Sequence, residues 1–374
     1  MFNFKTILQR IWDNGRAGGV QTHLLLLLLI PCSLIYGVVI CLRNSLYNLG
    51  VFKQQKLAAG VISIGNITVG GTGKTPMVIM LARLLREKGM QPAVLSRGYG
   101  GTSIAPVNIV SDGKNVLMSA TEGGDEPVLI AKSAPDVPVL TGPRRILTGG
   151  AAIRQMGANV LILDDAFQHR DVMRDINIVL IDAARPFGNG FLLPAGPLRE
   201  PLSALERADI IIAVGTADHC GSNPFDLTEF ENKIRPFNKS APVFYAIRKP
   251  TALRQGGAGP VYPPGDLKGK KICAFSGIAN PAAFKKTLMF LGADVVRFIA
   301  FPDHHHFNSN DVKQLQDAFD RAGAEFMVTT EKDAIKLDPF PFFLNSLLIL
   351  TIEMDILSAR EAFETLLLGK LQDT

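Results

Sequence analysis

A glycine-rich turn organises this sequence, and it reads Thr68-Val69-Gly70-Gly71-Thr72-Gly73-Lys74-Thr75. The turn follows an apolar run at 61–64 and precedes a segment, 75–89, whose apolar side chains recur at helical spacing. Apart from Thr68 at its first position, it matches the phosphate-binding P-loop, GxxxxGK(S/T), between a strand and a helix. We therefore predict that the residues of this turn bind a nucleoside triphosphate.

The residue types of the turn define its chemistry. Glycines let backbone N–H groups converge on phosphate oxygens, and the N-terminus of the following helix adds a favourable dipole. We expect Lys74 to reach the β- and γ-phosphates, and the Thr75 hydroxyl to bind Mg²⁺. The predicted cofactors are ATP and Mg²⁺.

A second apolar run, 160–163, ends in two carboxylates, Asp164 and Asp165. Open parallel sheets bind their ligands at the carboxyl ends of the strands, and a P-loop enzyme needs a carboxylate there to hold Mg²⁺. We predict Thr75, Asp164 and Asp165 as metal ligands. Which aspartate is the direct ligand stays open.

Strands alternate with helices through most of the chain, with further apolar runs at 92–95, 176–181 and 210–214. This alternation favours a mostly parallel sheet covered on both faces. A Pro/Gly-rich stretch, 251–269, is typical of a linker. A second βαβ series follows it, with predicted strands at 272–275, 295–301, 325–329 and 347–352 and predicted helices at 281–291, 309–322 (N-cap Ser309) and 358–368.

We predict an α/β protein with a P-loop NTPase-like, mostly parallel sheet and a second, smaller α/β domain. The predicted domains are an N-terminal segment with a membrane-associated helix at 1–57, a P-loop core at 58–250, a linker at 251–270 and the second domain at 271–374.

The composition excludes several classes of protein. The 374 residues suit two α/β domains, and the 47% apolar content excludes a disordered or collagen-like chain. A net charge of +5 does not indicate a nucleic-acid binder, but it suits anionic membranes or phosphorylated substrates. The four cysteines, Cys32, Cys41, Cys220 and Cys273, form no CxxC pair, so neither a disulfide framework nor a zinc site is expected.

Residues 24–42 contain no charged residue. A helix of that length is roughly 28 Å long, enough for the hydrocarbon core of a bilayer. We predict a membrane anchor that is separable from the βα pattern. A helix inserted part-way and bent at Pro31, a cleaved signal peptide and a buried core helix are the alternatives. Basic residues lie on both sides of the segment, so they give no orientation: Lys5, Arg10, Arg16, Arg43, Lys53 and Lys56.

Three further clusters carry polar side chains. The first, Ser96–Gly101, follows the strand at 92–95, and the second, Gly123–Pro127, precedes a helix. The third, Phe301–Phe307, contains three consecutive histidines. As purely structural features, the first cluster would be a tight turn, the second a helix N-cap region and the third a solvated loop.

Together these motifs resemble the tetraacyldisaccharide 4′-kinases, which phosphorylate the lipid A precursor of Gram-negative bacteria. The resemblance extends over essentially the whole chain. Thr68 at the first P-loop position is normal for this family. The motifs that carry the resemblance are Gly65–Pro76, Ser96–Gly101, Gly124–Pro127, Leu163–Arg170, Phe187–Glu200, Phe301–Phe307 and Thr330–Lys336.

The resemblance implies transfer of phosphate from ATP to the 4′-hydroxyl of a tetraacylated glucosamine disaccharide 1-phosphate. It implies that Asp125 is the base, helped by His304, and that Lys74 completes the catalytic set. Arg97, Tyr99 and Gln168 are the expected substrate-binding residues. The lipid substrate implies an enzyme at the inner membrane with its catalytic domains on the cytoplasmic side. Neither a nucleic acid nor a protein partner is indicated.

Two other functions compete with this one. A membrane-associated switch ATPase of the partitioning type also has a G-G-x-G-K-T loop, but it carries a signature lysine where this chain has Val69. A metal phosphoesterase that uses Asp303, His304 and His305 has no P-loop. A lipid kinase consumes ATP stoichiometrically with lipid phosphorylation, whereas a switch ATPase hydrolyses it alone.

Overall fold

The structure is a computed structural model that describes residues 12, 20–216, 225–257 and 259–372. Lys5, Arg10, Arg16 and Cys220 lie outside the described residues. The three described cysteines, Cys32, Cys41 and Cys273, are free thiols.

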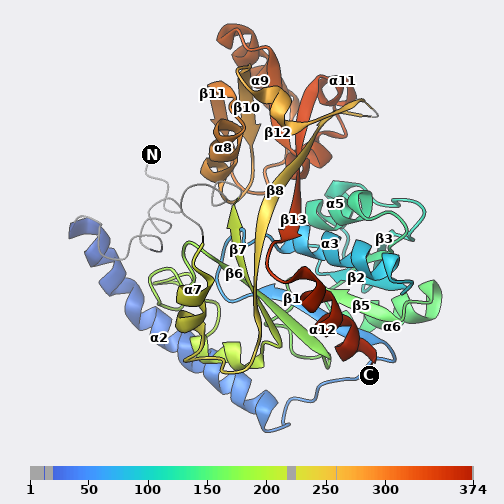
Figure 1. The fold of residues 1–374 in the computed structure, drawn as a ribbon, viewed down its shortest axis with the longest axis vertical. Coiled ribbons are helices and arrows are strands. Elements are labelled where there is room, and N and C mark those ends of the chain that lie inside the picture. Colours follow the sequence, from blue (N-terminus) through green and yellow to red (C-terminus); the bar gives the residue numbers. More distant parts are fainter. Residues whose placement is uncertain (1–11, 13–19, 217–224, 258, 373–374) are drawn as a thin grey trace.

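One sheet of 13 strands runs through the molecule in the order β11-β10-β12-β13-β8-β7-β6-β1-β5-β2-β4-β3, with β9 paired to β8 (Figure 1). Most neighbours are parallel, as predicted, and the antiparallel pairs are β13·β8, β3·β4 and β8·β9. The strands are β1 (Gly60–Asn66), β2 (Pro92–Ser96), β3 (Asn108–Ser111), β4 (Val139–Thr141), β5 (Val160–Leu163), β6 (Ile176–Asp182), β7 (Ile210–Thr216), β8 (Val243–Gln255), β9 (Val261–Tyr262), β10 (Lys271–Ser276), β11 (Asp294–Ala300), β12 (Phe326–Thr330) and β13 (Leu347–Ile356).

Helices cover both faces of the sheet. They are α2 (Val20–Asn48), α3 (Lys74–Glu87), α4 (Ala120–Gly123), α5 (Asp125–Ser133), α6 (Arg145–Met156), α7 (Leu227–Ile234), α8 (Pro281–Phe290), α9 (Ser309–Ala322), α10 (Glu331–Ala334), α11 (Pro341–Asn345) and α12 (Arg360–Gln372). Short 3₁₀ turns lie at Leu202–Arg207, Pro264–Leu267 and Ile335–Leu337.

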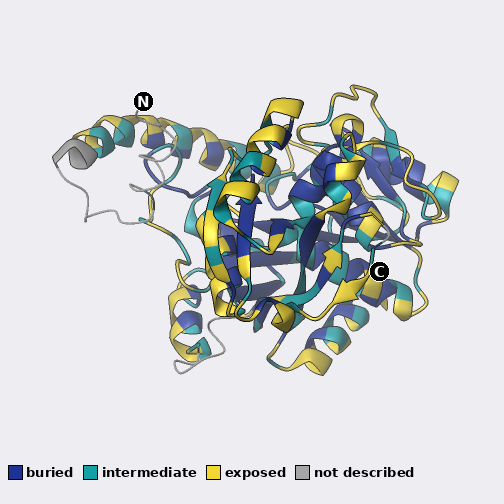
Figure 2. Cartoon of the chain, turned by 90° about the horizontal axis from the view of Figure 1, so that it is seen from above, coloured by how far each residue is buried: buried dark blue, intermediate teal, exposed yellow. Residues whose placement is uncertain are grey.

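The core follows from the alternation of side chains along each strand. In β1, Ile62 and Ile64 pack with α3, α5 and α12 on one face of the sheet. Val61 points to the other face, where it packs with α6. Because both faces are covered, the central strands are buried along nearly their whole length, and Figure 2 shows them at the centre of the molecule. This explains the continuous apolar runs in the sequence.

Two long strands join the halves of the molecule. The first half of β8 pairs in parallel with β7, and most of β8 pairs antiparallel with β13. The start of β13 pairs in parallel with β12, so β8 and β13 belong to both halves (Figure 1). They carry the smaller α/β unit of β10, β11 and β12 at a fixed position relative to the P-loop half.

The predicted linker, 251–270, is not an irregular segment at its start. Residues 251–255 continue β8, and β9 then pairs back on β8. The linker prediction rested on prolines and glycines, but those prolines, Pro260, Pro263 and Pro264, all follow the end of β8 at Gln255. The division of the chain into domains at these residues stays a prediction.

Most predicted elements are present within a few residues, but one predicted N-cap was wrong. Asn308, not Ser309, caps α9. The Asn308 side chain accepts the N–H groups of Asn310 and Asp311, and the Asp311 carboxylate accepts the Asn308 N–H. This reciprocal pair is a capping box, in which both residues satisfy otherwise unpaired N–H groups.

Helix α2 lies along one side of the P-loop half (Figure 1). Most of its apolar side chains are exposed, with Leu28 at 68% and Val38 at 69%, so the buried-core-helix alternative is wrong. By length and composition, Leu24–Asn48 is long and apolar enough to cross a membrane. Pro31 lies inside the helix, which continues on both sides of it.

Helix α2 is nevertheless docked on the core through polar groups. The Ser33 hydroxyl donates to the Leu192 carbonyl at 2.7 Å and accepts the Ala195 N–H at 2.9 Å. The Tyr36 hydroxyl donates to the Arg199 carbonyl at 2.7 Å. These contacts argue against the expectation that the helix is simply separable from the core.

The C-terminal part of α2 contacts a fully buried carboxylate, that of Glu200. Asn44 Nδ2 donates to Glu200 at 2.8 Å, and Arg43 and Arg207 lie 3.4 and 2.9 Å from its oxygens. A buried carboxylate needs such partners because desolvation otherwise makes its charge very costly. Loss of α2 would therefore leave Glu200 with fewer partners.

Candidate active site

The P-loop lies between β1 and α3, as predicted. Gly73 caps α3 with φ of 86°, and Gly70 has φ of 131°, conformations that other residues rarely adopt. The Val69 N–H donates to the Pro197 carbonyl at 2.8 Å, which ties the start of the loop to the Phe187–Glu200 segment. Thr72 is buried, and its hydroxyl oxygen has no hydrogen-bond partner within the described part of the chain.

Asp165 faces the P-loop lysine. Its Oδ1 lies 3.5 Å from Lys74 Nζ, and Arg199 Nη1 donates to both carboxylate oxygens at 2.9 and 3.0 Å. Burial alone would raise the pKa of Asp165, but Lys74 and Arg199 hold that pKa below its usual range. Asp165 is therefore ionised in the folded protein at neutral pH.

Asp164 has a different environment although it is the adjacent residue. It is 2% exposed, and only its Oδ2 has a partner, the Ser96 hydroxyl at 3.0 Å. Its Oδ1 is buried with no hydrogen-bond partner among the residues described. Burial, followed by the negative charges of Glu126 and Asp165, raises the pKa of Asp164 to about 7.

These observations fit a divalent cation. An unpartnered buried oxygen and mutually repelling carboxylates are stabilised by a hard cation, which prefers oxygen ligands. Thr75 and the two aspartates supply oxygen donors of the kind that P-loop enzymes use, together with substrate phosphates. In the ranges that the structure covers, there is no group of three or more His, Cys, Asp or Glu side chains that could hold a metal ion.

Asp125 and His304 meet across the two halves of the molecule. Asp125 is the first residue of α5 and is 6% exposed. His304 belongs to the loop after β11, and its Nδ1 lies 2.9 Å from Asp125 Oδ2 and 3.2 Å from Oδ1. The pair is thus in hydrogen-bond contact, although 179 residues separate its members.

The pair has mutually supporting charges. Burial would raise the pKa of Asp125, but the hydrogen bond from His304 and the charge of Lys332 hold it below its usual value. The hydrogen bond to Asp125 in turn raises the pKa of His304, against the opposing effects of burial and of Lys332. Asp125 is therefore ionised at neutral pH, which is the state in which a carboxylate can accept a proton.

The predicted substrate-binding residues lie at the same edge of the sheet but differ in their contacts. Arg97 is exposed directly after β2. Tyr99 is 68% exposed, and the centre of its ring lies 5.3 Å from that of His304. Gln168 donates from Nε2 to the Asn66 carbonyl at 2.9 Å, so it also supports the end of β1.

Sequence reasoning assigned no role to three charged residues that the fold brings to the site: Glu126, Arg199 and Lys332. Lys332 Nζ lies 3.0 Å from Glu126 Oε1, and Arg199 holds Asp165. All three fall inside motifs that carry the family resemblance, but the motifs alone do not show which side chains meet.

The histidine run is not a metal centre. His304 pairs with Asp125, whereas His305 Nε2 lies 3.0 Å from Asp311 Oδ2 and its ring stacks on Phe301. His306 is exposed. Because these side chains diverge, the arrangement argues against a metal phosphoesterase.

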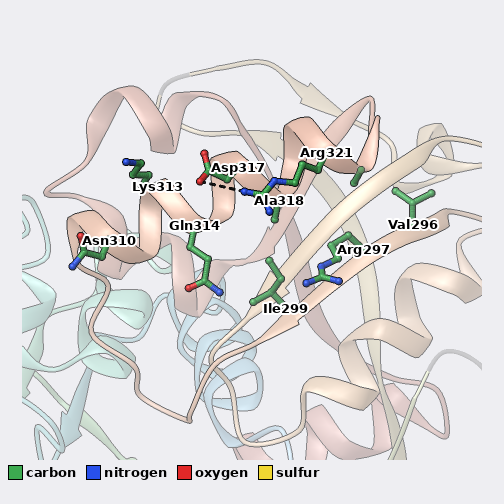
Figure 3. A pocket seen from close by; sticks show the side chains of 10 residues that line it. Val296, Arg297, Ile299, Asn310, Lys313, Gln314, Asp317, Ala318 and Arg321 are labelled. Carbon is green, nitrogen blue, oxygen red and sulfur yellow. Dashed lines mark ion pairs between the residues drawn. The ribbon is translucent and has the colours of Figure 1, made fainter.

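One cavity in the described part of the chain lies away from these residues. It has a volume of about 660 Å³ and lies between β11 and α9 of the smaller unit (Figure 3). Arg297, Lys313 and Gln314 are among its lining residues, and none of the predicted site residues lines it. This cavity is therefore not part of the predicted site.

The fold and the site define a P-loop kinase, because the P-loop, its lysine and the strand-end carboxylates converge on one edge of the sheet beside a possible proton acceptor. The sequence model of the tetraacyldisaccharide-1-P 4'-kinase family matches residues 25–372. The chain belongs to the tetraacyldisaccharide 4'-kinase family.

Individual relatives agree with this assignment. The chain is 50% identical over 374 residues to the tetraacyldisaccharide 4'-kinase of Syntrophus aciditrophicus. This match covers 99% of this chain and 100% of the relative. It is 42% identical to that of Anaeromyxobacter sp. (strain K), over 88% of this chain and 86% of the relative. These matches exclude the switch-ATPase alternative.

A solved structure has the same fold. It is an "apo" form of LpxK from Aquifex aeolicus in complex with ATP, with a TM-score of 0.73 and 34% identity. The match covers 91% of this chain and 98% of the Aquifex chain.

Proposed function

We propose that this protein transfers the γ-phosphate of ATP to the 4′-hydroxyl of a tetraacylated glucosamine disaccharide 1-phosphate at the inner membrane, on its cytoplasmic side. The observation that carries the proposal is the Asp125–His304 pair, at 2.9 Å, on the same edge of the sheet as Lys74 and its P-loop. A nucleotide site alone serves many enzymes, but an acid–base pair beside it serves transfer to a hydroxyl group.

The P-loop residues bind and orient the nucleotide. Backbone N–H groups within residues 70–75 and at the start of α3 hold the phosphates, and Lys74 neutralises charge on the transferring group. Thr75, Asp164 and Asp165 would hold Mg²⁺, which when bound supplies further positive charge to the phosphate oxygens. Binding of ATP is supported by the ATP complex of the Aquifex relative.

Asp125 activates the acceptor. A sugar hydroxyl has a very high pKa, so its proton leaves late, while the bond from its oxygen to phosphorus forms and the bond to the ADP oxygen breaks. Asp125 receives the proton, and His304 orients the carboxylate and shares the developing charge. Arg97, Tyr99 and Gln168, at the same edge, are the proposed contacts to the sugar.

The lipid nature of the substrate is supported by α2. Its exposed apolar side chains suit the acyl region of a bilayer, while Ser33 and Tyr36 hold its other face against the core. An acceptor that cannot leave the bilayer requires an enzyme at the bilayer surface.

The test combines purified full-length protein, Mg-ATP and the disaccharide 1-phosphate in detergent micelles or vesicles. We expect one ADP per molecule of bisphosphorylated lipid. ATP consumption without lipid product would overturn the proposal. Membrane association is tested separately by flotation with vesicles of phosphatidylethanolamine and phosphatidylglycerol, in which protein that stays unbound would contradict the location.

A further inference from the structure

Lys332 lies among the charged groups of the Asp125–His304 pair. It is the second residue of α10 in the smaller unit, and its side chain is 17% exposed. Its Nζ lies 3.0 Å from Glu126 Oε1 and 3.4 Å from His304 Nε2. Carboxylate oxygens of Asp303 and Asp125 follow at 3.7 and 3.9 Å.

The contact between Lys332 and His304 restricts where the imidazole proton lies. A lysine ammonium can only donate, so the His304 Nε2 that it approaches must be the unprotonated, accepting nitrogen. Nδ1 then carries the hydrogen and donates it to Asp125, which accepts when ionised. One tautomer of His304 thus satisfies both neighbours, and the other satisfies neither.

We propose that Lys332 is a positioning residue for phosphoryl transfer: its ammonium donates to His304 Nε2 and thereby directs the Nδ1–H of His304 toward Asp125. The proposal rests on the proposed function, because it assigns Lys332 to the pair that activates the acceptor hydroxyl. Lys332 acts through His304 and Asp125 and needs no contact with the substrate.

The charges around the pair explain why a cation is needed there. Asp125 and Glu126 come from α5, and Asp303 comes from the His304 loop, with Oδ2 lying 3.8 Å from His304 Nε2. The positive charges that act on Asp125 are those of Lys332, of His304 when it is protonated and, from the turn at Ile335–Leu337, of Lys336.

Two other groups complete the surroundings. Tyr99 packs its ring against the His304 ring, and Asp164 interacts electrostatically with Glu126. Without Lys332, the carboxylates of Asp125 and Asp303 would act on His304 with little opposition, and the imidazole would retain a proton on both nitrogens to a higher pH.

The test is the pH dependence of kcat and KM in the full-length enzyme for Lys332→Met and Lys332→Arg. In Lys332→Met we expect kcat at pH 7.5 to fall roughly ten- to hundredfold and the acid limb of the profile to move upward by about one pH unit. The KM for ATP should stay within a few-fold. Lys332→Arg keeps the charge and should keep the acid limb close to that of the wild type.

Lys132→Met is the matched control. Lys132 also forms an ion pair across the two halves, with Asp338 Oδ2 at 2.9 Å, but it does not contact the pair. If Lys332 only held the halves together, both methionine variants would lower kcat alike without moving the acid limb, and the proposal would fail. If Lys332→Met does not fold, Lys332→Gln replaces it, with the same expected displacement.

Failure of this inference is distinguishable from failure of the proposed function. A wild-type enzyme that makes no phosphorylated lipid, or an Asp125→Ala variant with full activity, refutes the proposed function. If the wild type is active, Asp125→Ala is impaired and the acid limb of Lys332→Met does not move, only the proposed role of Lys332 is refuted.

Discussion

The contact between Asp125 and His304 makes a quantitative prediction for a double-mutant cycle. Removing a general base commonly costs roughly 10² to 10⁴ in rate, so Asp125→Ala should lower kcat by that range. Nucleotide affinity should survive, because Lys74, Thr75 and Asp165 keep their contacts.

The size of the His304 effect follows from its hydrogen bond. Asp125 is buried and His304 is half-buried, and their 2.9 Å contact joins an imidazole to an ionised carboxylate. Hydrogen bonds to charged groups contribute about 1.5–3 kcal/mol, so His304→Ala should lower kcat about tenfold to 150-fold. The double variant should be little slower than Asp125→Ala, because His304 acts through Asp125.

The assay measures kcat, nucleotide affinity and melting temperature for the three variants. Asp226→Ala is the control, since Asp226 caps α7 by accepting the Glu229 N–H at 3.0 Å, far from the site. It should lose about 1 kcal/mol of stability and no turnover. If Asp125→Ala behaves like this control, Asp125 is only a structural residue. Multiplicative rate losses in the double variant would refute the coupling and leave His304 with a separate role.

Three further predictions concern other parts of the site. Lys74→Ala should lower transfer by about a hundredfold or more, because it removes the cation at the transferring phosphate, and single-turnover rates within a few-fold of wild type would contradict the P-loop assignment. Asp164→Asn should abolish transfer but raise the melting temperature in EDTA. The pKa of Asp164 is about 7 in the folded protein, above the usual value of about 4, so the stability of the wild type falls as the pH rises between these values. The gain in melting temperature of Asp164→Asn should therefore be small near pH 4 and full above pH 7. Equal melting curves at pH 8 would refute this account of Asp164. Deleting residues 1–48 should reduce vesicle flotation. It should also lower the melting temperature, because Glu200 loses its partners Arg43 and Asn44. An unchanged melting temperature would show that the helix is separable from the core.

The parts of the protein that sequence reasoning predicted well depend on neighbours in the chain. The P-loop is contiguous, so its glycines, Lys74 and Thr75 identify it without knowledge of the fold. The apolar runs of β1 and β5 are continuous because both faces of those strands are buried. The carboxylates after β5 reach the P-loop because parallel strands end at the same edge.

Other features were missed, one because it depends on distant pairing and one because two neighbouring residues suit the same role. The end of β8, residues 251–255, lies in the predicted linker, but about 100 residues later β13 supplies its hydrogen-bond partners. The cap of α9 was misplaced by one residue because Asn308 and Ser309 are both good capping residues, and the choice depends on the reach of Asp311.

The residue pattern was enough to establish the class of fold, the nucleotide-binding turn and the family of this chain, because each is written in contiguous motifs. Apart from the Asp125–His304 pair, which the family resemblance implied, it did not indicate which charged side chains meet. Arg199 contacts Asp165 across 34 residues, and Lys332 contacts Glu126 across 206. Such pairs depend on how β8 and β13 hold the smaller unit against α5, and the energy of an ion pair depends on distance and burial, which a linear sequence does not contain.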